Sequence, residues 1–227
     1  MDFDSLYEEI VRVTDNSYHS RIKKRIRYTW EQISPLISSD STVAEIGIGP
    51  MSALVKRLKG AEVIGIDLND DQSALCKAFQ IELKTCDIQA EPLPLEDESV
   101  DVILFLETIE HLCAYPNNVL DNMYKKLKTG GYLSLSTTNF LRISSRVRVL
   151  LGKNPLRNYF EPSPSGRNHI REYVPDEMEY YMRKSGFSIE KTCRFGIPYG
   201  PRIVSALLCL AYLYPGFRNY FMITGKK

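Results

Sequence analysis

A glycine-containing turn between an apolar run and an amphipathic stretch most constrains the fold of this chain. The run Val43-Ala44-Glu45-Ile46 leads into Gly47-Ile48-Gly49-Pro50, and apolar residues then recur at helical spacing through residue 58. This order predicts a strand, a tight turn and a helix N-terminus. A second apolar run, 63–66, ends at Asp67. The unit is therefore strand, helix and strand, with a carboxylate at the tip of the second strand.

The same turn indicates what kind of ligand it accepts. Glycines let a ligand approach the backbone closely, and a carboxylate at the second strand tip accepts hydrogen bonds from a ribose diol. Glu45 would repel a pyrophosphate but attract an amino group. The third glycine of the dinucleotide pattern is replaced by Ser52. We therefore expect an adenosine-containing ligand with a free amino group; the alternative is a turn that serves only strand–helix packing.

Length and composition exclude several other classes of protein. The chain has 227 residues and a net charge of +1, which fits one α/β domain and gives no overall field for DNA or other nucleic acid. Five cysteines without C-x-x-C pairing and an acidic start predict a cytoplasmic protein without a signal peptide. The apolar run 203–214 is too short to span a bilayer. We expect a buried helix there; the alternative is peripheral membrane contact.

Two helices precede the central unit. We expect a short one over 3–13 and a longer one over 17–37, whose last turn Pro35 weakens. A basic cluster accompanies the apolar stripe of the second helix. It is interpreted as a solvated face, or alternatively as a rim over a site for an anionic substrate. Its members are Arg21, Lys23, Lys24, Arg25 and Arg27.

Strands and helices then alternate. Predicted strands cover 42–46, 62–66, 82–86, 100–106, 132–137, 187–195 and 218–224. Predicted helices cover 51–59, 70–80 with Asn69 or Asp70 as cap, a main helix up to about 128 after a break near Pro116, and 175–184. Gly130-Gly131 is predicted to end the helix that precedes the fifth strand.

The stretch 138–173 shows no clean periodicity and carries many arginines with aromatic residues between them. So long an insertion in a compact domain is usually a lid or a binding element; the alternative is a decoration that covers a sheet edge. Its basic and aromatic residues are Arg142, Arg146, Arg148, Lys153, Arg157, Arg167, Arg171, Phe140, Tyr159, Phe160 and Tyr173, against Glu161 and Glu172.

Five motifs in order resemble those of class I S-adenosylmethionine-dependent methyltransferases, over roughly residues 42–195. They are Glu45-Ile46-Gly47-Ile48-Gly49, Gly65-Ile66-Asp67, Cys86-Asp87-Ile88, Phe105 through Leu112, and Leu127 through Leu133. Met51, where the family often has a third glycine, and Pro50 depart from the pattern. The resemblance implies a Rossmann-like, mostly parallel seven-stranded sheet with helices on both faces and an antiparallel last strand. The residues themselves add the N-terminal helices and the insertion after strand five to this expected fold.

The length of the chain predicts one methyltransferase domain over 1–227. Within it we expect an N-terminal helical cap at 1–40, a cofactor-binding core at 41–137, a substrate-binding insertion at 138–174 and the C-terminal part of the sheet at 175–227. The implied cofactor is S-adenosyl-L-methionine. Its implied contacts are Gly47 and Gly49 under the methionine part, Glu45 at the amino group, Asp67 with Leu68 at the ribose, Asp87 and Ile88 at the adenine, and Glu107 near the sulfonium.

The expected activity is O-methylation of a small-molecule or glycan-type, including lipid-linked sugar, acceptor. An oxygen nucleophile must lose its proton, and His169 and His111 are the candidate bases, with Glu107 beside the substrate. The segment Asn168 through Tyr173 resembles one found in methyltransferases that act on glycans, lipid-linked sugars and related small molecules. That resemblance places His169, Arg171 and Tyr173 over the site, where the basic residues favour an anionic acceptor.

A divalent metal is a further alternative. Glu107, Glu110 and His111 are spaced i, i+3, i+4, which places them on one side of a helical turn, with His169 as a fourth ligand. The cluster resembles a metal site of small-RNA 2′-O-methyltransferases and of some quinone-pathway O-methyltransferases. In most relatives with such a run, Glu110 and His111 serve local hydrogen bonding instead, so the metal stays open.

Two other functions compete with methyl transfer. A nicotinamide-dependent oxidoreductase shares the strand–turn–helix unit, but Glu45 and Ser52 argue against it. A catalytically silent, cofactor-binding partner subunit is the other alternative, which Glu107, His111 and His169 weigh against.

Overall fold

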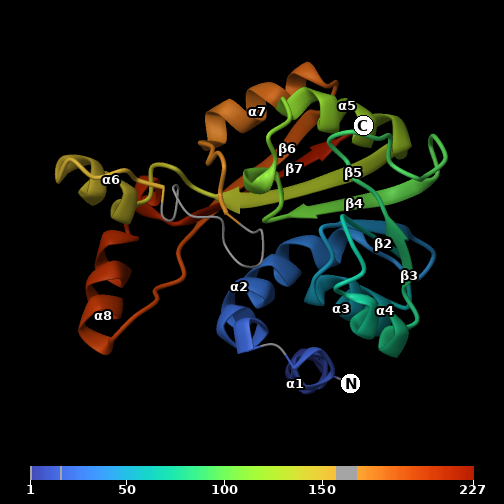
Figure 1. The fold of residues 1–227 in the computed structure, drawn as a ribbon, viewed down its shortest axis with the longest axis horizontal. Helices are drawn as coiled ribbons and strands as arrows, with labels where there is room; N and C mark the ends of the chain where they lie inside the picture. The colour runs from blue at the N-terminus through green and yellow to red at the C-terminus, as the bar shows by residue number, and fades with distance from the viewer. Residues whose placement is uncertain (1, 16, 157–167) are drawn as a thin grey trace.

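The computed structural model describes residues 2–15, 17–156 and 168–227. Its centre is a seven-stranded sheet in the order β3-β2-β1-β4-β5-β7-β6, in which only β7 runs antiparallel to its neighbours (Figure 1). This confirms the predicted Rossmann-like fold class. The strands are β1 Thr42–Ile46, β2 Glu62–Asp67, β3 Glu82–Thr85, β4 Val100–Leu106, β5 Leu127–Thr138, β6 Ser188–Phe195 and β7 Tyr220–Lys226.

Helices cover both faces of the sheet. One face carries α1 to α4 and the other carries α5 and α7, while α6 and α8 lie to one side (Figure 1). The α-helices are α1 Phe3–Thr14, α2 Ser17–Ile33, α3 Pro50–Lys59, α4 Ser73–Phe79, α5 Pro116–Lys126, α6 Ile143–Leu150, α7 Pro175–Lys184 and α8 Arg202–Ala211. Short 3-10 turns are η1 Ser34–Leu36, η2 Ile109–His111 and η3 Pro215–Phe217.

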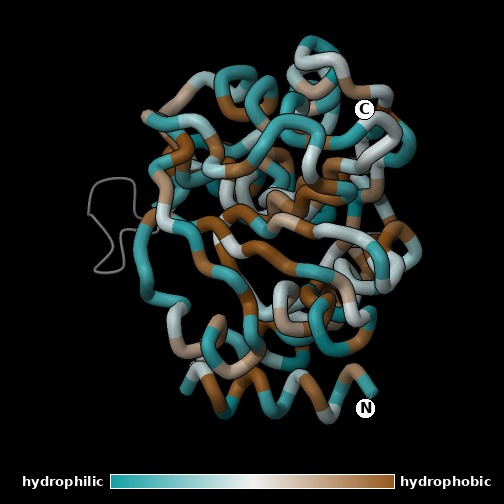
Figure 2. The backbone as a smooth tube through the Cα atoms, turned by 90° about the vertical axis from the view of Figure 1, so that its right-hand side faces the viewer, coloured by the Kyte–Doolittle hydropathy of each residue, from teal (hydrophilic) through white to brown (hydrophobic). Residues whose placement is uncertain are grey.

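Each face has its own apolar core. Helices α1 and α2 turn amphipathic stripes, including Leu6, Ile10 and Ile33, against α3 and α4. Figure 2 shows this pattern as brown and teal alternating along the N-terminal helix. On the opposite face, Met123 of α5 and Met182 of α7 pack on the central strands. The N-terminal helices are therefore integral to the core of one face.

Two local predictions need correction. Gly130-Gly131 does not end a helix: α5 ends at Lys126, and both glycines lie inside β5. A Cβ on Gly131 would lie 2.8 Å from the Asp101 carbonyl oxygen, so close strand packing explains the glycine there. Helix α4 begins at Ser73 after Gln72 without a side-chain cap; Asn69 instead accepts from the Asp71 backbone N–H in the preceding turn.

The insertion and the run 203–214 also differ from expectation. Residues 143–150 form α6, although the arginines there obscure a helical period. Five residues of the insertion that the sequence analysis singled out lie outside the described residues: Arg157, Tyr159, Phe160, Glu161 and Arg167. Helix α8 is not the buried helix predicted for 203–214, because none of its residues is buried. Within the described ranges, no helix is long and apolar enough to cross a membrane.

Candidate functional site

A cavity of about 870 Å³ opens at the carboxyl ends of the parallel strands. It lies where the strand order reverses between β1 and its neighbours β2 and β4, the position at which open α/β sheets bind ligands. Helix α2 forms one wall, and the turns after β1, β2, β3 and β4 form the others. Every predicted cofactor residue lines it: Glu45, Gly47, Gly49, Asp67, Leu68, Asp87, Ile88 and Glu107.

The glycine turn has a geometry that few residues can replace. Gly47 has φ of 78°, and a Cβ on it would lie 2.2 Å from Thr108 Oγ1. Its backbone N–H donates to the Ile66 carbonyl at 2.8 Å, which holds the turn against β2. A left-handed φ and a forbidden contact both require glycine here. The turn therefore brings the start of α3 close to the tip of β2.

Glu45 is almost fully buried beneath this turn. It accepts hydrogen bonds from the Ser52 backbone N–H at 2.8 Å and from the Ser52 hydroxyl. Ser52 thus supplies a partner that a glycine at this position lacks. Burial disfavours the carboxylate and raises the pKa of Glu45 to about 7, although the bonds from Ser52 oppose the rise. A cation at this position would restore the ionised form.

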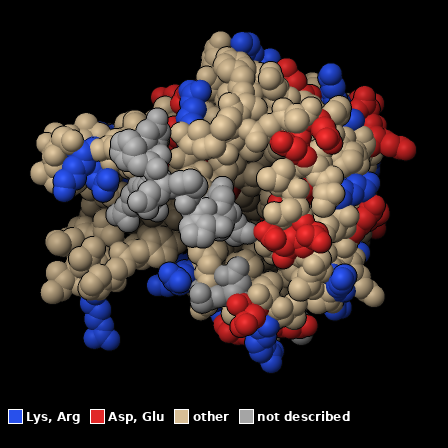
Figure 3. Space-filling model, in the orientation of Figure 1, with Lys and Arg blue, Asp and Glu red and all other residues tan. Residues whose placement is uncertain are grey.

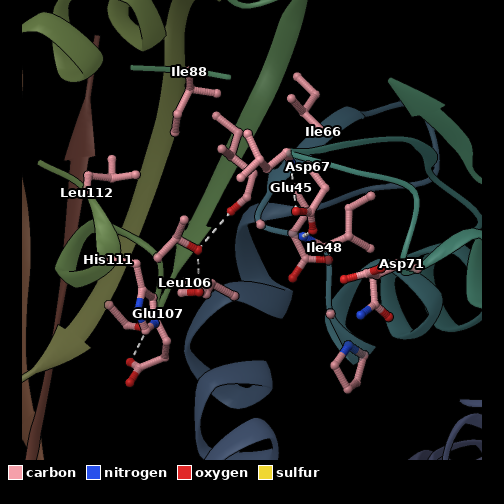
Figure 4. Close-up of a pocket in the computed structure, with 18 of the residues that line it drawn as sticks. Glu45, Ile48, Ile66, Asp67, Asp71, Ile88, Leu106, Glu107, His111 and Leu112 are labelled. Atoms are coloured by element: carbon pink, nitrogen blue, oxygen red, sulfur yellow. Dashed lines mark hydrogen bonds between the residues drawn. The ribbon is translucent and has the colours of Figure 1, made fainter. Parts of the chain in front are cut away.

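Two further carboxylates lie at successive strand ends. Asp67 accepts from the backbone N–H groups of Ile48 at 2.9 Å and Leu68 at 2.8 Å, so its orientation is fixed by the glycine turn. Asp87 accepts from the Gln89 N–H at 3.0 Å in the turn after β3. Figure 4 shows Glu45 and Asp67 on one side of the cavity, with Glu107 and His111 across from them. The site thus has an acidic wall suited to hydroxyl and amino donors.

A buried ion pair joins α2 to the end of β4. Arg25 Nη1 donates to Glu107 Oε2 at 2.9 Å, and Ser136 Oγ donates to Glu107 Oε1 at 2.9 Å. The Arg25 guanidinium also lies 5.4 Å from the centre of the Tyr220 ring. Within the described part of the chain, Arg25 Nε has no hydrogen-bond partner. The solvated-face interpretation is therefore wrong for Arg25, which lines the cavity; Arg27 and Lys23 instead pair with Asp4 near the surface.

The histidine wall is assembled from two distant segments. The backbone N–H of Ile170 donates to the Glu110 carbonyl at 2.8 Å, which ties the segment after the insertion to η2. His111 Nδ1 lies 2.9 Å from the Asn168 carbonyl, and the His111 and His169 ring centroids are 5.1 Å apart. Because a carbonyl only accepts, Nδ1 of His111 donates. Its Nε2 is then the basic or metal-binding nitrogen.

His169 is held in the same manner by a carboxylate. Its Nδ1 lies 2.8 Å from Glu172 Oε1, and its Nε2 lies 4.0 Å from Glu110 Oε1. Burial lowers the pKa of His169, but the bond to Glu172 and the charges of Glu110 and Glu172 outweigh it and raise the pKa. Burial, and after it the charge of Glu107, raises the pKa of Glu110. The His169 imidazole, which lines the cavity, and the buried Glu110 carboxyl beside it thus both favour their protonated forms.

One atom each from Glu110, His111 and His169 lie within 4.8 Å of one another, which is compatible with a shared cation. Glu107 does not join this group, contrary to the predicted i, i+3, i+4 arrangement. It precedes η2 with φ of 51°, and its oxygens are taken by Arg25 and Ser136. The predicted helical turn that would align all three is absent at Glu107, which is why it departs from the cluster.

The predicted acceptor residues Arg171 and Tyr173 are not among the residues that line the cavity. Tyr173 is 1% exposed and belongs to the core beneath α7. Arg171 pairs with Glu177 of α7, and its guanidinium lies 4.9 Å from the centre of the Tyr173 ring. Their chain neighbour His169 lines the cavity instead, with Glu172 buried behind it as the partner of its Nδ1.

Sequence reasoning missed several lining residues on α2. Tyr18, His19 and Thr29 line the cavity beside Arg25, so all three histidines of the chain do. His19 Nδ1 lies 2.9 Å from Thr14 Oγ1. The helical period marks the apolar stripe of α2 but not the side of the helix that faces a ligand. The basic cluster was the only feature of this helix that indicated a possible site. It did not distinguish Arg25 from the other four basic residues.

Comparison with known proteins agrees with this geometry. Residues 44–135 match the family described as "Methyltransferase domain". The chain is 29% identical to the mitochondrial ubiquinone biosynthesis O-methyltransferase of Candida albicans over 88% of this chain and 63% of that protein. It is 26% identical to the ubiquinone biosynthesis O-methyltransferase of Pseudomonas putida strain W619 over 78% of this chain and 75% of that protein.

The fold also has solved counterparts. A SAM-dependent methyltransferase from Archaeoglobus fulgidus superposes with a TM-score of 0.66 at 18% identity, covering 93% of this chain and all (100%) of that one. The strand order, the glycine turn and the acidic strand ends agree with the match of residues 44–135 to a methyltransferase domain, and the whole arrangement is consistent with class I S-adenosylmethionine-dependent methyltransferases. The cofactor of this chain is accordingly S-adenosyl-L-methionine. The chain spans less than two thirds of the length of some curated relatives, 63% for the Candida protein.

Proposed function

We propose that this chain transfers a methyl group from S-adenosylmethionine to a hydroxyl of a small-molecule acceptor. The observation that carries the proposal is the opposition, across one cavity, of three acidic strand ends and a histidine pair. The names of the curated relatives, ubiquinone biosynthesis O-methyltransferases, support oxygen as the methylated atom. Glycan-type and anionic acceptors remain predictions, because Arg171 is engaged outside the cavity lining.

In this proposal, different cavity residues contact different parts of the cofactor. Gly47 and Gly49 leave room for the methionine part, and Glu45 accepts from its amino group. Asp67 takes the ribose hydroxyls, and Asp87 accepts from the adenine amino group with Ile88 against the ring. The fit is supported at Glu45, an almost fully buried carboxylate that lines the cavity, because a cationic amino group beside it would favour the ionised form that burial disfavours.

Replacement of Glu45 by glutamine is expected to stabilise the free protein at pH 8 while weakening cofactor binding. Because the folded pKa of Glu45 is raised to about 7, the folded state keeps a proton that the unfolded chain loses near pH 4.5, and stability falls as pH rises between these values. Glutamine removes that loss, so Tm at pH 8 should rise by several degrees. Affinity for S-adenosylhomocysteine should fall roughly ten- to a hundredfold with the charged acceptor gone.

The matched control for this change is Glu62→Gln, which alters an exposed glutamate at the start of β2. It should move neither Tm nor affinity. Differential scanning fluorimetry and calorimetric titration measure the two quantities. A Glu45→Gln protein that binds S-adenosylhomocysteine as wild type does would remove Glu45 from the cofactor amino group.

The chemistry requires little from the protein beyond alignment and removal of a proton. When bound, the cofactor would supply an electrophilic methyl group. The cavity walls hold the acceptor oxygen opposite it and exclude water. His169 takes the acceptor proton at Nε2, while Glu172 holds its Nδ1–H and stabilises the imidazolium that forms. Since the pKa of His169 is raised, activity should increase with pH above the ordinary histidine range.

A divalent ion is an alternative use of the same histidines. Glu110, His111 and His169 offer one carboxylate and two imidazoles, and Nδ1 of each histidine is held by an oxygen, as is usual for ligating histidines. These residues fit an ion that would lower the pKa of a bound hydroxyl. His169 Nε2 cannot both hold an ion and accept a proton. The two versions therefore exclude each other.

One assay tests the activity and separates the versions. The protein is incubated with S-adenosylmethionine and a panel of catechols, phenols, glycans and anionic sugars, and products gaining one methyl group are identified by mass spectrometry. Full turnover in excess chelator with loss in His169→Gln supports the base. Loss in chelator, restored by Mg²⁺ or Mn²⁺, supports the ion. Cofactor binding without any cofactor-dependent product across the panel would contradict the proposed function.

A further inference from the structure

Two helices stand apart from the sheet and together expose a large apolar surface. Helices α6 and α8, with the turns that follow them, form what we call the helical arm, residues 141–156 and 201–217 (Figure 1). Leu150 is 85% exposed, Ile203 78% and Leu213 77%. Other apolar side chains of the arm are also exposed. They are Leu141, Val147, Val149, Leu151, Val204, Leu207, Leu210 and Tyr214.

The exposed residues of α8 follow one face. Ile203, Leu207 and Leu210 are spaced i, i+4 and i+7, so their side chains project on the same side of the helix. A surface helix of a globular protein usually turns such a stripe to the core, but within the described chain α8 has no buried residue. Contiguous exposed apolar surface of this kind marks an interaction site. The stripe thus faces away from the protein's own core.

The charges of the arm have a single sign. The segments 139–156 and 196–219 contain arginine and lysine but no aspartate or glutamate. The left-hand part of Figure 3, where the arm lies, shows blue groups on a tan surface, while red groups gather mainly on the right. Lys153 and Arg202 are exposed, whereas Arg146 and Arg148 are half-buried and donate to backbone carbonyls within the arm. An exposed apolar surface bordered by basic residues is complementary to a partner that is both apolar and negatively charged.

We propose that the helical arm docks on the surface of a lipid bilayer that carries anionic headgroups. Helix α8 has ten residues, which at roughly 1.5 Å each make it about half the hydrocarbon thickness. It therefore lies in the plane of the interface, with its leucines in the acyl region and its basic residues at the headgroups. Tyr212 and Tyr214 supply the aromatic residues typical of that interface.

The arm is also connected to the cavity. Arg142, in the arm, pairs with Glu172, which holds His169 Nδ1 at 2.8 Å. Arg146 of α6 lies 5.5 Å from the Phe217 ring, so the two parts of the arm contact each other. Glu172 is thus the single residue that links Arg142 of the arm to His169 in the cavity wall. The docking itself does not depend on which reaction the cavity performs.

Vesicle flotation of the whole chain tests this inference. Wild type should float with vesicles of equal parts phosphatidylcholine and phosphatidylglycerol, and float less with phosphatidylcholine alone or at high salt. Leu207→Gln/Leu210→Gln keeps helix propensity and should weaken partitioning by roughly tenfold per leucine. Lys153→Glu/Arg202→Glu should weaken binding to the anionic vesicles only. The control Tyr180→Gln changes an exposed aromatic of α7 outside the arm, and should float as wild type does.

Circular dichroism and S-adenosylhomocysteine binding confirm that each variant is folded. Failure of wild type to float with anionic vesicles would overturn the proposal, as would equal flotation of the double glutamine variant. A concentration-dependent dimer that dissociates in the glutamine variant, without vesicle binding, would assign the arm to a second copy of the chain and also overturn it. None of these outcomes depends on finding the methyl acceptor.

Discussion

Asp67→Ala is expected to lose most affinity for S-adenosylhomocysteine while the fold survives. Asp67 lies at the tip of β2, half-exposed and aimed into the cavity, where its carboxylate also orients the glycine turn through Ile48 and Leu68. A charge-assisted hydrogen bond contributes roughly 1.5–3 kcal/mol, so Kd should rise roughly ten- to a hundredfold. Calorimetric titration measures it.

Two controls separate the ribose contact from disturbance of the turn. Asp67→Asn keeps an acceptor for one backbone N–H but loses the charge, and should fall between wild type and alanine. Asp70→Ala removes an exposed neighbouring carboxylate that does not line the cavity, and should bind normally. Unchanged binding by Asp67→Ala would reject the ribose role.

Arg25→Ala is expected to give the largest loss of stability. The side chains of Arg25 and Glu107 are only 10% and 13% exposed, so removing the guanidinium leaves a carboxylate uncompensated in a poorly hydrated site. Breaking such a pair typically lowers the free energy of unfolding by roughly 3–5 kcal/mol. Urea denaturation of Arg25→Ala, Glu107→Gln and the double variant gives the coupling between them.

The double variant should be more stable than Arg25→Ala, because it removes the stranded charge. Arg27→Ala is the matched control, since its ion pair with Asp4 is exposed and such pairs contribute little. If the effects of the two single substitutions simply add in the double variant, Arg25 and Glu107 are not coupled, and α2 is held over the cavity by packing alone.

The parts of the fold that sequence could predict are those encoded locally. The apolar runs at 42–46 and 100–106, the glycine turn and the carboxylates that follow strands are each readable within a few residues. The structure places Glu45, Asp67 and Asp87 together because parallel strands end at one edge of the sheet. The sequence order of strands and turns was therefore sufficient to assemble the acidic wall.

The parts that could not be predicted depend on contacts between distant segments. Arg25 and Glu107 are 82 residues apart, and nothing near Arg25 distinguishes it from four other basic residues. Gly130-Gly131 resembles a helix end, but Gly131 packs against the Asp101 carbonyl of β4, and Gly130 has a left-handed φ of 82° within β5. The apolar content of α8 predicts burial. The sequence of α8 does not determine what its apolar face packs against. The tertiary arrangement of the rest of the chain determines it, and in the structure this face is exposed.

The central claim is that the cavity is built for S-adenosylmethionine, as opposed to a nicotinamide dinucleotide. Thermal denaturation of the wild-type chain with each ligand tests it most directly. At a hundredfold excess over Kd, S-adenosylhomocysteine should stabilise the fold by about 2.7 kcal/mol, which raises Tm by roughly 5–10 °C. NAD should leave Tm unchanged, because its pyrophosphate would meet Glu45. A rise with NAD and none with S-adenosylhomocysteine would contradict the account.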